Sequence, residues 1–138
     1  YFLFTKKMDA LIFLPAISVG LLSTAVLNLN NMRDQKNDQK VGKNTIVVIF
    51  GATFSKYYHL CLITIALICA CLYSIIQYVH PIQYLFCIAF IPLVKHLSTV
   101  FLNKEESTLD SELKKVALST FLFAILFGLG QLLSLQIL

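Results

Sequence analysis

Two aspartates and a group of asparagines follow the first long apolar run of the chain. Asp34 and Asp38 are four residues apart, and Asn28 and Asn31 precede them. If the apolar run continues as one helix, a rotation of 100° per residue places these four side chains on one arc of about 120°. Carboxylates at this spacing repel each other unless a cation neutralises them. Because Mg²⁺ prefers carboxylate oxygens and keeps several waters, the pattern predicts Asp34 and Asp38 as its ligands.

Basic residues near this motif add a second kind of chemistry. Lys43 is placed to bind a phosphate as a point charge. Arg33 falls on the arc opposite the acidic one, where we expect a packing role. Lys95 is the only charge inside an apolar run. It is either a lysine that extends to the membrane surface or a cation that meets a diphosphate or a substrate carboxylate. The plain alternative for the whole motif is a solvated helix with mixed charges.

The composition identifies the class of protein that must position these residues. Of 138 residues, 58% are hydrophobic and 13% charged, against about 45–50% and about 25% in soluble domains. This excludes a disordered chain and argues against a soluble fold, so we predict an all-α polytopic membrane protein in contact with the lipid bilayer. The basic residues lie between apolar runs, where topology explains them, and we expect no nucleic-acid partner.

Four apolar runs predict four transmembrane helices. Each has about 20–23 residues, which as a helix is long enough to cross a bilayer. The predicted spans are 10–29, 58–79, 82–102 and 116–138. The segment 30–57 is then a loop that carries the motif, and we interpret its part 45–50 as loop rather than strand. His59 and His80 are expected at the membrane interface, and His96 is expected to be structural.

The distribution of basic residues predicts the orientation of these helices. The two long loops contain eight of them, against Lys6 and Lys7 on the opposite side. The eight are Arg33, Lys36, Lys40, Lys43, Lys56, Lys104, Lys114 and Lys115. By the positive-inside rule the motif loop is cytoplasmic and the C-terminus lies outside.

The residues from 28 to 45 also carry a resemblance. They form the pattern N-x-N-N-x-R-D-x-x-x-D-x-x-x-G-K-x-T. This pattern resembles the second aspartate-rich motif of the UbiA family of intramembrane prenyltransferases, and is most similar to the members that serve menaquinone synthesis. Tyr58-His59 and Leu93-Val94-Lys95 extend the similarity, which covers nearly the whole chain.

The resemblance implies a fold, a reaction and a set of site residues. The family has about nine helices and a first aspartate-rich motif that we do not find here. The chain, one helical unit over 1–138, is therefore expected to be the C-terminal part of such an enzyme, inactive without its N-terminal half. The implied reaction joins a polyprenyl diphosphate to 1,4-dihydroxy-2-naphthoate and releases CO₂ and diphosphate, in a bacterial plasma membrane. Asp34 and Asp38 would bind Mg²⁺, and the substrate contacts would be Asn28, Asn31, Lys43 and Lys95.

Two alternatives stay open at this point. A related prenyltransferase could use another acceptor, such as 4-hydroxybenzoate or haem. A non-catalytic membrane subunit or a transporter fragment would depend neither on magnesium nor on a prenyl diphosphate.

Overall fold

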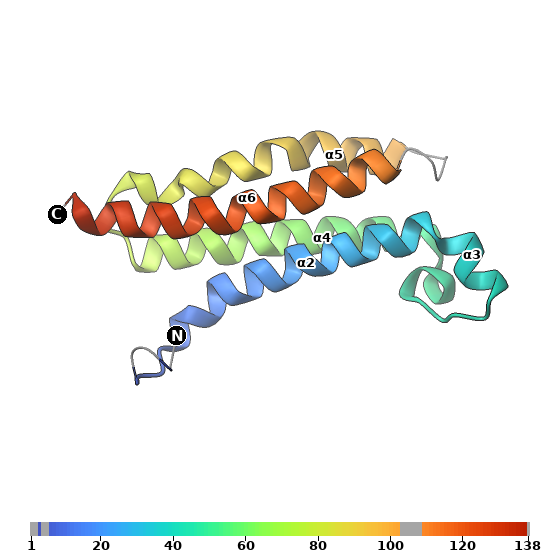
Figure 1. Ribbon diagram of the computed structural model, residues 1–138, viewed down its shortest axis with the longest axis horizontal. Coiled ribbons are helices and arrows are strands. Elements are labelled where there is room, and N and C mark those ends of the chain that lie inside the picture. Colours follow the sequence, from blue (N-terminus) through green and yellow to red (C-terminus); the bar gives the residue numbers. More distant parts are fainter. Residues whose placement is uncertain (1–2, 4–5, 103–108, 138) are drawn as a thin grey trace.

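Four long helical segments lie side by side in the computed structural model (Figure 1). The structure describes residue 3 and residues 6–102 and 109–137. Within these residues all regular structure is helical, which confirms the all-α prediction. The elements are η1 (Ala10–Ile12), α2 (Phe13–Arg33), α3 (Gln35–Lys40), α4 (Ile46–Ile76), η2 (Pro81–Phe90), α5 (Ile91–Leu102) and α6 (Leu109–Gln136).

The four predicted spans are confirmed as helices that are long and apolar enough to cross a membrane. Their bounds are Ala10–Arg33, Ile46–Ile76, Pro81–Leu102 and Leu109–Gln136. The second and fourth begin earlier than predicted, because helix formation does not stop where polar residues begin. The loop predicted over 30–57 is therefore limited to the residues between Arg33 and Ile46, and these include the short helix α3. The interpretation of 45–50 as loop was wrong: Thr45 caps α4 by accepting a hydrogen bond from the backbone N–H of Val48 at 3.3 Å. Gly51, at φ 83°, then interrupts α4 after one turn.

The third span consists of two kinds of helix. Its first ten residues, η2, form a 3₁₀ helix, and α5 continues it as an α-helix. Pro81 starts η2 and Pro92 stands at the second position of α5. Proline has no N–H, so Pro92 cannot make the bond that an α-helix would require at the junction. The 3₁₀ segment η2 therefore ends two residues before Pro92.

The bundle is held together by small residues and aromatic rings along its interior. Gly130 of α6 packs directly on the backbone of η2, where an added Cβ would lie 2.9 Å from the carbonyl oxygen of Ile82. Beside it the Gln83 side chain donates to Gln131 Oε1 at 2.7 Å, and so ties η2 to α6. Phe86 and Phe123 meet edge to face in the adjoining core.

The two ends of the bundle differ. Both chain termini lie at one end, and α3 lies at the opposite end, where α2 finishes and α4 begins (Figure 1). The fold therefore gathers the motif, the end of α5 and the start of α6 at one pole, which we call the motif end.

Candidate active site at the motif end

The chain turns at Asp34, between α2 and α3. Asp34 (φ −91°, ψ 5°) is both the C-cap of α2 and the N-cap of α3. Its N–H still donates to Asn30 at 3.0 Å, and its carbonyl accepts from Asp38 at 2.9 Å. Hydrogen bonding thus continues while the helix axis changes direction (Figure 1). The prediction of one continuous helix was wrong here, because six polar residues leave the apolar bundle and form a separate short helix.

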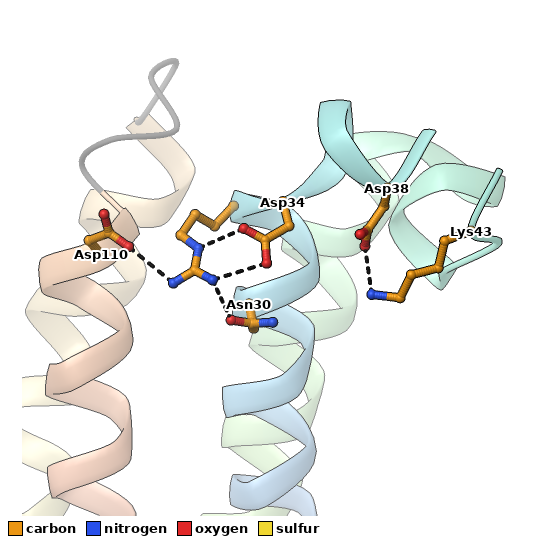
Figure 2. Close-up of polar contacts among 6 residues, drawn as sticks. Asn30, Asp34, Asp38, Lys43 and Asp110 are labelled. Atoms are coloured by element: carbon orange, nitrogen blue, oxygen red, sulfur yellow. Dashed lines mark hydrogen bonds and ion pairs between the residues drawn. The ribbon is translucent and has the colours of Figure 1, made fainter. Parts of the chain in front are cut away.

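Arg33 binds Asp34 with two parallel hydrogen bonds. Its Nε lies 2.8 Å from Asp34 Oδ1 and its Nη2 lies 3.0 Å from Oδ2. Nη2 also contacts Asn30 Oδ1 at 2.8 Å, and Nη1 reaches Asp110 Oδ1 of α6 at 3.1 Å (Figure 2). The Arg33 guanidinium lowers the pKa of Asp34 from its ordinary value through these bonds. The placement of Arg33 away from the acidic residues was wrong: the long side chain folds back across the helix end.

Asp38 has a different basic partner. Its Oδ2 lies 3.0 Å from Lys43 Nζ, and the Asp38 side chain is only 7% exposed. The loop after α3 produces this pair: Gly42, at φ 72°, allows the Lys43 N–H to return to the Asp38 carbonyl at 2.9 Å. This is the helix-ending turn that favours glycine at a left-handed position. Figure 2 shows the two carboxylates directed to separate partners, Asp34 toward the guanidinium that also contacts Asp110 and Asp38 toward Lys43.

Asn28 and Asn31 line a small hollow between α2 and α4. The hollow measures about 30 Å³, which is room for about two water molecules. Thr24, Leu27, Ile46 and Tyr58 complete its lining. Asn28 is 3% exposed and donates from Nδ2 to the carbonyl of Ser55 at 3.0 Å. Its Oδ1 is buried with no partner among the described residues.

The structure brings together only part of the predicted site. Asp34 lies at the α2–α3 turn, Asp38 within α3 and Lys43 just after it, and the two asparagines lie one or two turns earlier on α2. Lys95 lies exposed on α5 and does not line the hollow. In the part of the chain that the structure describes, no three Asp, Glu, His or Cys residues converge as a metal site. Of the acids in the loop before α6, Asp110 and Glu112 fall in its first turn, while Glu105 and Glu106 lie outside the described residues.

A buried row of ionisable side chains near the motif end was missed. His59 Nε2 lies 2.8 Å from His96 Nε2, and His96 Nδ1 lies 2.6 Å from Glu112 Oε2. Lys115 Nζ contacts Glu112 Oε1 at 2.5 Å. The interfacial placement of His59 was wrong, since its side chain is fully buried. One signal was available: His96 continues the buried stripe of Leu93 and Val100 at helical spacing.

The oxygens at this end suit a hard divalent cation. Asp34, Asp38 and the neighbouring asparagine oxygens are the ligand types that Mg²⁺ takes, together with water. Each of the two carboxylates has a basic partner in this structure. The donor types are therefore those that fit magnesium.

Comparison with known proteins shows which family the chain belongs to. The model of the UbiA prenyltransferase family matches residues 1–125. The chain is similar to a 1,4-dihydroxy-2-naphthoate octaprenyltransferase of Haemophilus influenzae, with 39% identity over 96% of this chain and 43% of the relative. It is also similar to the 1,4-dihydroxy-2-naphthoate octaprenyltransferase of Escherichia coli, with 37% identity over 89% of this chain and 40% of the relative.

The chain thus spans about two fifths of the length of these curated relatives. No solved structure is significantly similar to it. Its four apolar helices make it a multi-pass membrane protein. A match over most of its length, together with the aspartate motif at the end of α2, establishes that the chain belongs to the UbiA prenyltransferase family.

Proposed function

We propose that this chain is part of a membrane prenyltransferase that joins a polyprenyl diphosphate to 1,4-dihydroxy-2-naphthoate, with release of CO₂ and diphosphate. The observation that carries this proposal is the α2–α3 turn, where two carboxylates and two basic side chains lie at the end of a transmembrane helix. The names of the two relatives support the choice of acceptor.

Asp34 and Asp38 would hold Mg²⁺ in this enzyme. The bound ion supplies charge neutralisation to the diphosphate, which makes it a better leaving group. Arg33 and Lys43, when they leave the carboxylates, are free to bind the negative charge that develops on the same diphosphate. Asn31 lines the hollow, three residues before Asp34, and would orient the substrate.

The remaining contacts belong to the aromatic acceptor and the prenyl tail. Asn28 offers a buried, unpartnered carbonyl oxygen to a hydroxyl group. Lys95 is exposed on α5. It would contact the acceptor carboxylate in a pocket that helices outside this chain complete. A lipid-embedded helical bundle suits a long prenyl chain and keeps water away from an allylic cation.

We further propose the orientation of the site and its dependence on other helices. The basic loops favour a cytoplasmic motif end in a bacterial plasma membrane. A prenyl diphosphate carries more charge than one pair of carboxylates with one metal can balance. The 138-residue chain alone is therefore expected to insert into a membrane without catalysing the reaction.

The test compares two aspartate variants in the full-length enzyme. Asp34→Asn removes a proposed metal ligand and should lower turnover by about 10²-fold or more, as for a lost electrostatic stabiliser. Asp110→Asn is the matched control, because Asp110 contacts the same Arg33 but is more exposed, and it should retain most of the activity. Product formation is measured with purified protein, prenyl diphosphate, dihydroxynaphthoate and magnesium. Near-normal turnover of Asp34→Asn would exclude the metal role.

A further inference from the structure

The outward face of α2 carries a stripe of mostly small residues that the described part of the chain leaves uncovered. The stripe consists of Ala16, Gly20, Ser23, Leu27 and Asn31. These residues follow one another at intervals of three or four and therefore share one side of the helix. The first four are exposed and Asn31 is half-buried. A Cβ added at Gly20 would meet nothing within 4 Å. We call this stripe the α2 seam.

α2 also belongs to the least covered of the four spans. Only 17% of the apolar window of its span is buried, against 22–39% in the other three. The first turns of α2 stand apart from the other helices (Figure 1). Because α2 has 21 residues, it is about 30 Å long. The α2 seam is therefore long enough for a second transmembrane helix to lie along it.

The α2 seam reaches the hollow between α2 and α4. Leu27 and Asn31 belong to the seam and also line the hollow, beside Asn28. Leu27 is 58% exposed, so this side of the hollow is not closed by the chain. Asn28 Oδ1 is buried without a partner among the described residues. Acyl chains offer no hydrogen bonds, so polar groups at membrane depth need protein or enclosed water around them. The hollow therefore needs a protein wall on the side of the seam.

The outward face of α6 differs in its residues. Its exposed side chains include Leu118, Phe121 and Leu132, which are large and apolar and suit contact with acyl chains. Gly128 of this face also has open space around it. The α2 seam combines small residues with a polar hollow, and small residues are what allow two membrane helices to approach closely. The two faces are therefore expected to have different neighbours.

We propose that the α2 seam is the docking surface for a transmembrane helix of the same enzyme, supplied by the part of the protein outside this chain. The proposal rests on the proposed function in one respect, namely that this chain is part of a longer enzyme. The chain covers 43% and 40% of its two relatives, so more than half of each relative lies outside the matched region. A helix that is covalently joined to this chain has a higher effective concentration at the seam than a second copy has.

The docked helix completes the wall of the candidate site. It covers Gly20 and Ser23 at close range and closes the hollow at Leu27 and Asn31. The docked helix is expected to be apolar beside Gly20 and to carry a hydrogen-bonding side chain at the level of Asn31. A hollow that opens to lipid cannot hold a polar group of a substrate, so the site is incomplete until this helix is in place.

The first experiment measures whether lipid reaches the α2 seam. The full-length protein, with its native cysteines replaced, is reconstituted in nanodiscs that hold one copy, and a nitroxide is attached through Leu27→Cys. Leu118→Cys of α6 is the matched control, because Leu118 is 68% exposed within this chain and Leu27 is 58% exposed. Power-saturation EPR gives the accessibility of each nitroxide to oxygen, which concentrates in the acyl-chain region.

We expect the nitroxide at position 27 to be several-fold less accessible to oxygen than a lipid-borne nitroxide at the same depth. The nitroxide at position 118 should approach the value of the lipid-borne one. Full lipid accessibility at position 27 would overturn the proposal. Protection that appears only in discs with two copies would assign the seam to a second chain, and would overturn it as well.

The second experiment compares two glycines in the full-length protein. An added Cβ meets nothing within 4 Å at either Gly20 or Gly128, so within this chain Gly20→Leu and Gly128→Leu should be tolerated equally. If a helix docks on the seam, Gly20→Leu overpacks the contact and should lower the unfolding temperature by about 2–4 °C or more relative to Gly128→Leu. If Gly20→Leu does not accumulate in the membrane, Gly20→Ala and Gly128→Ala make the same comparison. Equal unfolding temperatures of the pair compared would contradict docking.

Neither experiment uses a substrate, so the docking and the proposed function can fail separately. If position 27 is protected and the full-length protein forms no prenylated product, the docking stands and the proposed function fails. If product forms while position 27 is open to lipid, the docking is wrong and the proposed function stands.

Discussion

Arg33 is the residue on which most contacts of the motif end converge. It binds Asn30, Asp34 and Asp110 through three different nitrogens. A guanidinium can do this because its donors lie in a rigid plane, whereas a lysine would satisfy fewer of these partners. In the absence of metal this arrangement keeps Asp34 ionised and in place.

The effect of Arg33 on Asp34 predicts a pH dependence. The folded pKa of Asp34 lies below its ordinary value, so the stabilisation is present above the unfolded pKa of about 3.9 and is lost as the pH falls through the folded pKa. Arg33→Gln should therefore lower the unfolding temperature modestly at pH 7, since both groups are partly exposed. The difference from wild type should shrink as the pH falls below the unfolded pKa of about 3.9. A difference independent of pH would contradict the pairing.

At the level of elements, the contact between η2 and α6 sets how closely the third and fourth spans approach. Gly130 leaves room for the η2 backbone, and the Gln83–Gln131 hydrogen bond lies beside it. Small residues permit such close approach of helices within a membrane, where hydrophobic burial gives little drive for association.

Alanine substitution of two neighbouring glycines tests this contact. Gly130→Ala places a methyl group 2.9 Å from the Ile82 carbonyl oxygen, and should destabilise the protein by about 1–3 kcal/mol through overpacking. Gly128→Ala is the matched control, because nothing lies within 4 Å of its added Cβ, and it should change stability by less than about 1 kcal/mol. Thermal unfolding in detergent measures both. Equal effects would show that the contact is not tight.

At the level of the whole molecule, the bundle has two unlike poles. The termini share one pole and the α3 segment occupies the other (Figure 1). This arrangement follows from four antiparallel spans, and it places the polar motif and the buried histidine row toward the same end of the bundle.

The proposed orientation is tested with reporters of membrane topology. A reporter fused after Leu138 should be active outside the cytoplasm, and one inserted between Leu102 and Leu109 should be active inside, because the basic loops are retained there. The expression level of each fusion is the control. The reverse pattern would remove the motif from cytoplasmic magnesium.

How much of this could be read from the sequence depended on the range of the interactions. The four spans were predictable because each is a local run of apolar residues, and the motif was predictable because Asp34 and Asp38 share one short segment. The turn at Asp34 was not, because a short polar helix leaves the bundle for reasons of solvation. The pairing of His96 with Glu112 joins residues 16 positions apart on different helices, which no periodicity in one sequence reveals.

The bond between Arg33 and Asp110 has a consequence for biogenesis. The two residues are 77 positions apart, and a ribosome adds about 5–20 residues per second. Arg33 is therefore synthesised about 4–15 s before Asp110. During that interval the nascent chain has α2 but lacks the hydrogen bond that joins α2 to α6. A chain whose synthesis stops before α6 therefore has Arg33 without its contact to Asp110.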